Sequence, residues 1–122
     1  MSEPVGTFCL VLHTHLPWLP HHGSWPVGEE WLYQAWATSY LPAIGMLDRF
    51  AEEGREDVLT LGVTPVLAAQ LDDPYCLREM RTWVGFWQTR AEGLATHDRT
   101  HMRATGVREY REAQRAQAEL EG

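Results

Sequence analysis

The sequence predicts an α/β fold that opens with two parallel β-strands and continues into long helices. Two apolar runs, residues 7–13 and 58–64, have the length and composition of buried strands. Apolar residues recur at helical spacing between them, which predicts a strand–helix–strand crossover. The two strands are therefore expected to be parallel, because a crossover helix is the usual connection between parallel neighbours.

The helix between the strands is expected to begin near Glu29 and Glu30 and to end at Gly54. Acidic side chains in a first turn complement the helix dipole, and Gly is favoured just past a helix end. Pro42 lies inside this stretch and cannot donate a backbone hydrogen bond. We therefore expect a kink at Pro42, or a division into two helices.

Three further helical segments are expected after the second strand. Residues 66–71 predict a short helical turn, and the Asp-Asp-Pro sequence at residues 72–74 predicts a helix start with Asp as N-cap. That second helix continues through Leu94. A polar linker over residues 97–106 then precedes a charged last helix over residues 107–120.

Two strands alone cannot form a complete sheet domain. Parallel sheets have several strands and are covered on both faces, and a (β/α) barrel needs on the order of 250 residues. The chain has 122 residues. Residues 1–122 are therefore expected to form the beginning of a larger domain, with no domain boundary inside them.

Composition narrows the classes of function. The net charge of −7 disfavours nucleic acid and anionic membrane surfaces as partners, because both attract basic patches. No apolar stretch approaches the length of a membrane span or resembles a secretory signal. Cys9 and Cys76 lack metal-ligand spacing, and Cys9 is expected to be a buried free thiol, as suits a reducing compartment. These features predict a globular cytoplasmic protein.

The most informative motif is His13-Thr14-His15, at the end of the first strand. Residues two apart on a strand lie on one face, about 6.6 Å apart, so the two imidazoles are expected to share one space. A neutral imidazole both donates and accepts hydrogen bonds, and it is also a common metal ligand. The motif by itself therefore leaves a sugar, a phosphate or a metal open.

Tryptophan is unusually frequent: the chain has six, and four of them lie within residues 18–36. Tryptophan serves either large cores or platforms on which flat ligands stack. Trp25 lies in a loop rich in Gly and Pro, and Trp31 lies at a helix start near the same end of the sheet. These two are candidates for stacking on a ligand, whereas Trp36 suits a helix core.

Three segments occur in a recognisable order. They are residues 11–17 (VLHTHLP), 23–31 (GSWPVGEEW) and 63–71 (VTPVLAAQL). Together they resemble the first strand, the following loop and helix start, and the second strand and turn of glycoside hydrolase family 57, in particular its α-1,4-glucan branching enzymes. The resemblance covers residues 7 to about 95.

The resemblance implies an irregular, incomplete (β/α)7 barrel that acts on α-glucans by a retaining double displacement. In this family one Glu attacks the anomeric carbon and one Asp is the acid/base, and the two carboxyl groups of retaining enzymes are about 5–5.5 Å apart. A branching enzyme transfers the glucan to a 6-hydroxyl rather than to water. Because the family's Glu and Asp come from later strands, no catalytic residue is assigned in this chain, which is expected to be inactive alone.

The resemblance also implies substrate-binding roles for His13, His15, Trp25 and Trp31. The histidines would line the sugar subsite beside the nucleophile, and the tryptophans would stack on glucose rings. It implies an amylose-like or glycogen-like α-glucan as partner, a role in glycogen biosynthesis, and no cofactor or metal. A second chain that carries the rest of the barrel would be one way to complete the enzyme.

Two alternatives follow from the same residues. An amidohydrolase-like or deacetylase-like enzyme would use His13 and His15 as metal ligands, but it would need further ligands, and residues 63–65 at the second strand's end are Val, Thr and Pro. The other alternative is a non-catalytic remnant. Glu29 and Glu30 do not suit a catalytic pair, because adjacent residues on a helix point apart.

Overall fold

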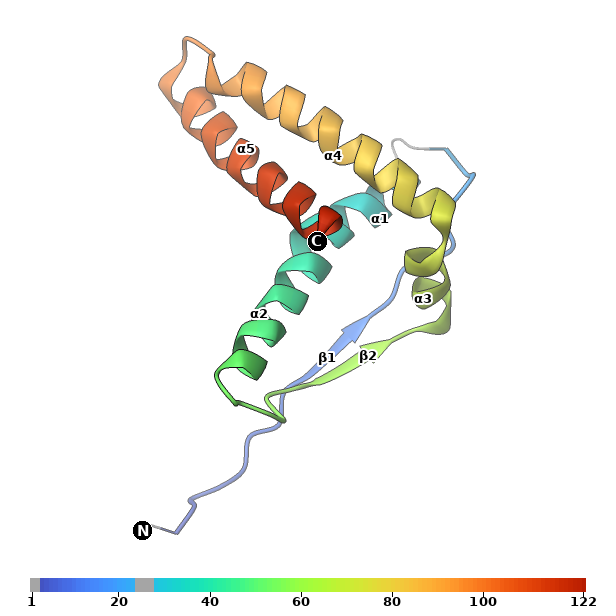
Figure 1. Cartoon of the computed structure of the whole chain (residues 1–122), viewed down its shortest axis with the longest axis vertical. Helices are drawn as coiled ribbons and strands as arrows, with labels where there is room; N and C mark the ends of the chain where they lie inside the picture. The colour runs from blue at the N-terminus through green and yellow to red at the C-terminus, as the bar shows by residue number, and fades with distance from the viewer. Residues whose placement is uncertain (1–2, 24–27) are drawn as a thin grey trace.

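The computed structural model describes residues 3–23 and 28–122 (Figure 1). Trp25 therefore lies outside the described residues. The elements follow in the order β1 (Val11–Thr14), α1 (Glu29–Ala35), η1 (Trp36–Tyr40), α2 (Leu41–Glu52), β2 (Thr60–Val63), α3 (Pro65–Asp72), α4 (Pro74–Ala95) and α5 (Thr100–Glu121).

The two strands pair in parallel, from Val11 beside Thr60 to Thr14 beside Val63, which confirms the predicted crossover. Both strands are shorter than predicted, because a strand extends only as far as it finds a partner. The segment before β1 runs away from the rest of the molecule (Figure 1), and Phe8 within it is exposed. The expectation of a buried Cys9 is wrong for the same reason, and its thiol is exposed.

The helical stretch between the strands is divided, as Pro42 predicts. A π-helical turn, η1, separates α1 from α2, and Pro42 lies in the first turn of α2. Proline has no N–H to donate, and just before it the Leu41 N–H donates to the carbonyl of Trp36, the five-residue spacing of a π turn. The wider π turn therefore absorbs the irregularity that a proline imposes on a continuous helix.

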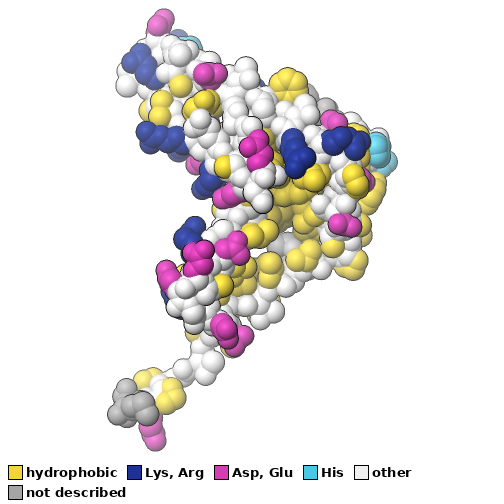
Figure 2. Space-filling model, viewed as in Figure 1, with side chains coloured by type: hydrophobic (Ala, Val, Ile, Leu, Met, Phe, Trp, Pro, Cys, Tyr) yellow, Lys and Arg dark blue, Asp and Glu magenta, His cyan; other side chains and the backbone are white. Residues whose placement is uncertain are grey.

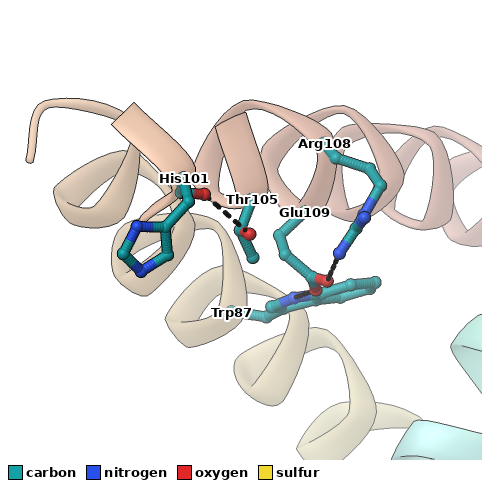
Figure 3. A network of polar contacts seen from close by, with 5 residues as sticks. All are labelled: Trp87, His101, Thr105, Arg108 and Glu109. Atoms are coloured by element: carbon teal, nitrogen blue, oxygen red, sulfur yellow. Dashed lines mark hydrogen bonds and ion pairs between the residues drawn. The ribbon is translucent and has the colours of Figure 1, made fainter. Parts of the chain in front are cut away.

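The two C-terminal helices form a long antiparallel hairpin (Figure 1). Asp73 caps α4, and its Oδ1 accepts the Tyr75 N–H at 2.8 Å, as predicted. Between the helices, Trp87 Nε1 donates to Glu109 Oε2 at 3.0 Å, and Arg108 lies 3.7 Å from the other oxygen of that carboxylate (Figure 3).

Helix α5 begins at Thr100, so the predicted polar linker over residues 97–106 is wrong for residues 100–106. The reason is tertiary packing at Gly106, where α5 comes so close to α4 that a Cβ would overlap the backbone of Leu94 and Ala95. Glycine weakens an isolated helix, but here it allows the two helices to meet.

The apolar core lies among the helices and not against the sheet. Helix α2 contributes no buried residue, and most strand residues are exposed. Figure 2 shows hydrophobic side chains uncovered where the strands lie. Among the described residues, the buried apolar side chains of this core are Leu19, Leu32, Tyr33, Trp36, Ala37, Leu67, Cys76, Met80, Val84, Trp87, Ala91, Ala113 and Ala116.

None of the described helices is long and apolar enough to cross a membrane.

Candidate functional site

The two histidines of the motif lie together at the carboxyl end of β1, as their spacing predicts. The ring centroids of His13 and His15 are 5.3 Å apart, with 30° between the ring planes. Thr14, between them, donates from Oγ1 to the Gly62 carbonyl at 2.9 Å. Both imidazoles are exposed to solvent and accessible to a ligand.

Gly62 faces His13 across the sheet and leaves space for its ring. The two residues are paired in the strand register, and a Cβ on Gly62 would lie 3.5 Å from His13 Nδ1. That distance is an ordinary van der Waals contact, so the Gly62 position lies directly beside the His13 ring.

The histidines open onto a groove of about 540 Å³ between the strands and the η1–α2 helix. This volume lies within the range of small-molecule pockets, about 300–1,000 Å³. The groove combines two polar imidazoles with an otherwise mainly apolar wall, which is the composition of a site that orients a ligand through few polar groups. Apolar side chains that line it are Leu12, Tyr40, Ala43, Ile44, Leu61, Val63, Leu67 and Leu71.

Thr64 adds a polar group at the carboxyl end of β2. Its N–H donates to the Thr14 carbonyl at 3.2 Å, which joins the two strand ends. Its hydroxyl oxygen is buried and has no hydrogen-bond partner within residues 3–23 and 28–122. Such a group is a free donor and acceptor. From the sequence, the Val-Thr-Pro segment served as part of a family motif and as evidence against further metal ligands, and the Thr64 hydroxyl was given no role.

Gln70, on α3, holds the segment that follows the histidines. It is fully buried, and its Oε1 accepts the Leu19 N–H at 3.0 Å. Its Nε2 donates to the carbonyls of Pro17 at 3.0 Å and Val66 at 3.2 Å. Sequence reasoning missed this role, and the only signal was one glutamine within an apolar helical turn.

Glu29 is the second polar anchor that sequence reasoning missed. It lies in the first turn of α1, as expected for a side chain that complements the helix dipole, but it is only 7% exposed. Its carboxylate accepts the His21 N–H at 2.7 Å, the Tyr75 hydroxyl at 2.9 Å and the Tyr33 hydroxyl at 3.2 Å. These bonds tie α1, α4 and the loop after the histidines to one another.

Burial and this carboxylate keep nearby groups neutral. The hydrogen bond to Glu29 raises the pKa of Tyr75 to about 12. Burial, together with the Glu29 charge, raises the pKa of Tyr33 well above its usual value. Burial also raises the pKa of the Cys76 thiol to about 11, so this cysteine is a packing residue and not a nucleophile.

The structure does not bring Trp31 to the groove. It lies on α1 with 45% of its surface exposed, and it is not among the groove's lining residues. Of the three predicted substrate-binding residues that the structure describes, His13 and His15 lie together and Trp31 does not join them. Within the described ranges, no group of three or more His, Cys, Asp or Glu side chains is placed to hold a metal ion.

Comparison with known proteins gives a consistent result. No protein-family profile matches the chain. A probable 1,4-α-glucan branching enzyme of Mycobacterium tuberculosis is 51% identical over 130 residues, which covers 94% of this chain and 25% of that protein. A 1,4-α-glucan branching enzyme of Thermococcus kodakarensis is 43% identical over 70 residues, which covers 57% of this chain and 10% of that protein.

Solved structures agree. A GH57-type branching enzyme from Pyrococcus horikoshii superposes with a TM-score of 0.82 at 33% identity, over 90% of this chain and 21% of that one. The chain is homologous to one segment of the family 57 branching enzymes. A second family 57 branching enzyme, from Thermococcus kodakaraensis in complex with glucose, matches with a TM-score of 0.78 at 29% identity, over 88% of this chain and 20% of that one.

The family 57 resemblance found in the three sequence segments is therefore confirmed. The predicted α/β fold, with two parallel strands and long helices, is confirmed as well. The chain spans between 10% and 25% of the length of the curated relatives reported above.

Proposed function

We propose that residues 1–122 form part of the (β/α)7 catalytic domain of a retaining α-glucan branching enzyme and contribute its His13–His15 sugar subsite. The adjacent imidazoles at the carboxyl end of β1 are the observation that carries this proposal. Ligands of parallel α/β sheets bind at that end of the strands. The homology to branching enzymes supplies the substrate class, an amylose-like or glycogen-like α-glucan.

The two imidazoles suit a sugar because each nitrogen can donate to or accept from a hydroxyl group. A glucose ring has no charge to neutralise and many hydroxyls to orient. Trp31, and Trp25 outside the described residues, remain candidate platforms for further glucose units along the chain of sugars.

The chemistry of branching requires two carboxyl groups that these 122 residues do not supply. The nucleophilic Glu would form a glycosyl–enzyme bond as the α-1,4 bond breaks, and the Asp would protonate the leaving oxygen and then take the proton of the attacking 6-hydroxyl. Both are proposed to come from strands that pair with the open edges of β1 and β2. His13 and His15 would hold the sugar in the orientation that this attack needs.

We place this enzyme in the cytoplasm and in glycogen biosynthesis, without a cofactor. The remaining strands belong either to the same polypeptide or to a second chain. In either arrangement residues 1–122 would bind and orient the glucan, and the remaining strands would supply the carboxyl groups for the covalent steps.

A chimeric enzyme tests the proposal. This chain would replace the matching segment of the Mycobacterium tuberculosis relative, and branching would be followed by the fall in absorbance of iodine-stained amylose. We expect the chimera to branch, and the H13A and H15A variants to lose about tenfold or more in rate, since each removes a hydrogen bond to substrate.

The matched control is H97A, because His97 lies in the turn between α4 and α5. It should branch at the rate of the parent chimera. Unchanged branching in both H13A and H15A would disprove the subsite. The isolated 122-residue chain should leave the absorbance unchanged, and clear branching by it would contradict the assignment of the carboxylates to other strands.

A further inference from the structure

The chain on both sides of His15 is held by one helix. On the N-terminal side, the N–H of Thr64, the N-cap residue of α3, donates to the Thr14 carbonyl at 3.2 Å. On the C-terminal side, Gln70 of α3 donates to the Pro17 carbonyl at 3.0 Å. His15 therefore lies between two backbone positions that are fixed to the same rigid element.

The amide of Gln70 acts as a substitute for a peptide group of a neighbouring strand. It donates to the carbonyl of Pro17 and accepts the N–H of Leu19, two residues further along the same segment. Its second hydrogen is directed to Val66 of its own helix at 3.2 Å. The amide thus uses both hydrogens and its oxygen, with the bond to Leu19 buried and the bonds to Pro17 and Val66 partly buried.

No other side chain of similar size performs this role. Ionised Glu has no hydrogen to donate, Asn is one methylene shorter, and Met has no amide at all. Loss of the amide would leave the buried Leu19 N–H without its acceptor, which is costly for a backbone group, and it would release the Pro17 carbonyl from α3. Because the φ angle of proline is fixed, the direction of the chain after His15 depends on where the Pro17 carbonyl is held.

We propose that Gln70 is a positioning residue that sets the orientation of the His15 imidazole and, through their ring contact, of the His13–His15 pair. The pair's geometry is a property of the chain itself. Its use in binding a sugar hydroxyl rests on the proposed function. Gln70 touches no substrate in this proposal and acts only through the Pro17–Leu19 segment.

The test compares three forms of the full chain by NMR, namely wild type, Q70M and Q88M. Q70M keeps the side-chain volume and removes the amide. Q88M is the matched control, because Gln88 also donates from its amide, to Gln117 at 2.6 Å, but does so on the exposed surface of the α4–α5 hairpin. The measurement is the NOE between the His13 and His15 rings, whose centroids are 5.3 Å apart.

We expect the inter-ring NOE in wild type and Q88M and its loss in Q70M. An NOE of wild-type strength in folded Q70M would overturn the proposal, as would its absence from wild type. If Q70M does not fold, the rates of amide hydrogen exchange in the wild-type chain test whether Gln70 holds the segment that follows His15. The Leu19 N–H should exchange at least tenfold more slowly than that of Trp18, which has no hydrogen bond within the described residues. Equal rates would overturn the proposal.

Maltohexaose separates this inference from the proposed function. It should shift the imidazole signals of wild type and Q88M, and it should bind Q70M about tenfold more weakly. If the NOE depends on Gln70 but maltohexaose shifts no imidazole signal in wild type, the positioning role stands and the sugar subsite fails. If maltohexaose binds Q70M as well as wild type while the NOE is lost, the subsite stands and Gln70 has no part in binding.

Discussion

The α4–α5 hairpin and the β1–β2 pair both carry apolar side chains, but the hairpin buries an apolar face between its helices and the strands leave most of theirs exposed. Met80 and Val84 of α4 are at most 1% exposed, whereas Val11 of β1 and Val63 of β2 are 66% and 46% exposed. The two helices follow each other in the sequence and pack antiparallel after a short turn. Parallel strands find their neighbours only through long crossovers, so a sheet needs much more chain before it is covered.

Stability and the candidate binding site come from different parts of this chain. The helices supply the core, and the strands, with their open edges, present the candidate sugar subsite. Sites that bind ligands are commonly found where the structure is least stable. Gln70 and Glu29 are the two polar anchors that connect the regions, because both hold the segment between β1 and α1 to helices.

The largest expected effect is a loss of stability when a side chain of the helical core is truncated. The same truncation near the strands should cost much less. Met80→Ala removes a fully buried side chain of the helical core and should lower the free energy of unfolding by about 2–5 kcal/mol. Ile44→Ala, on the half-exposed face of α2 toward the strands, should cost less than about 1 kcal/mol. Urea denaturation measures both. Equal losses would show that the sheet side carries a core of its own.

A smaller effect is expected from the close approach within the hairpin. Gly106→Ala should destabilise the chain by about 1–3 kcal/mol, because its Cβ would overlap the α4 backbone. Gly93→Ala is the matched control, since no atom outside its own helix lies within 4 Å of its Cβ position. That variant should be neutral or up to about 1 kcal/mol more stable. Thermal and urea unfolding would reveal the difference, and similar losses at both glycines would refute the close packing.

The smallest expected effect is a dependence of stability on alkaline pH. The pKa of Tyr75 is raised from 10.0 to about 12 by its hydrogen bond to Glu29. A raised folded-state pKa contributes stability that is fully present below pH 10, and this contribution is lost as pH rises toward 12. The melting temperature of wild type should therefore fall over this interval.

Tyr75→Phe tests the origin of that fall, because it removes the hydroxyl. The variant should melt lower than wild type near neutral pH and show a shallower decline between pH 10 and 12. Tyr110→Phe, on α5, is the control and should keep the wild-type slope. An identical slope in Tyr75→Phe and wild type would assign the alkaline transition to other groups.

Local signals in the sequence were sufficient for several features. The spacing of His13 and His15 places both on one face of a strand, Pro42 divides the helix, and Asp73 caps α4. Each depends on the geometry of a few consecutive residues. The three family segments were sufficient for the resemblance, because each is a run of consecutive residues, and the match to branching enzymes confirms it.

Tertiary structure decided the features that depend on distant partners. Cys9 is exposed because no element within residues 3–23 and 28–122 covers it, and the close packing of α5 on α4 at Gly106 favours a helix that begins at Thr100. Glu29 meets Tyr75 across 46 positions, and Gln70 meets Pro17 across 53. A periodic pattern shows which face of an element is apolar, but it carries no information about what lies against that face. The sequence by itself therefore determined the elements, the histidine pair and the family, and only the fold decided which polar side chains hold that pair in place.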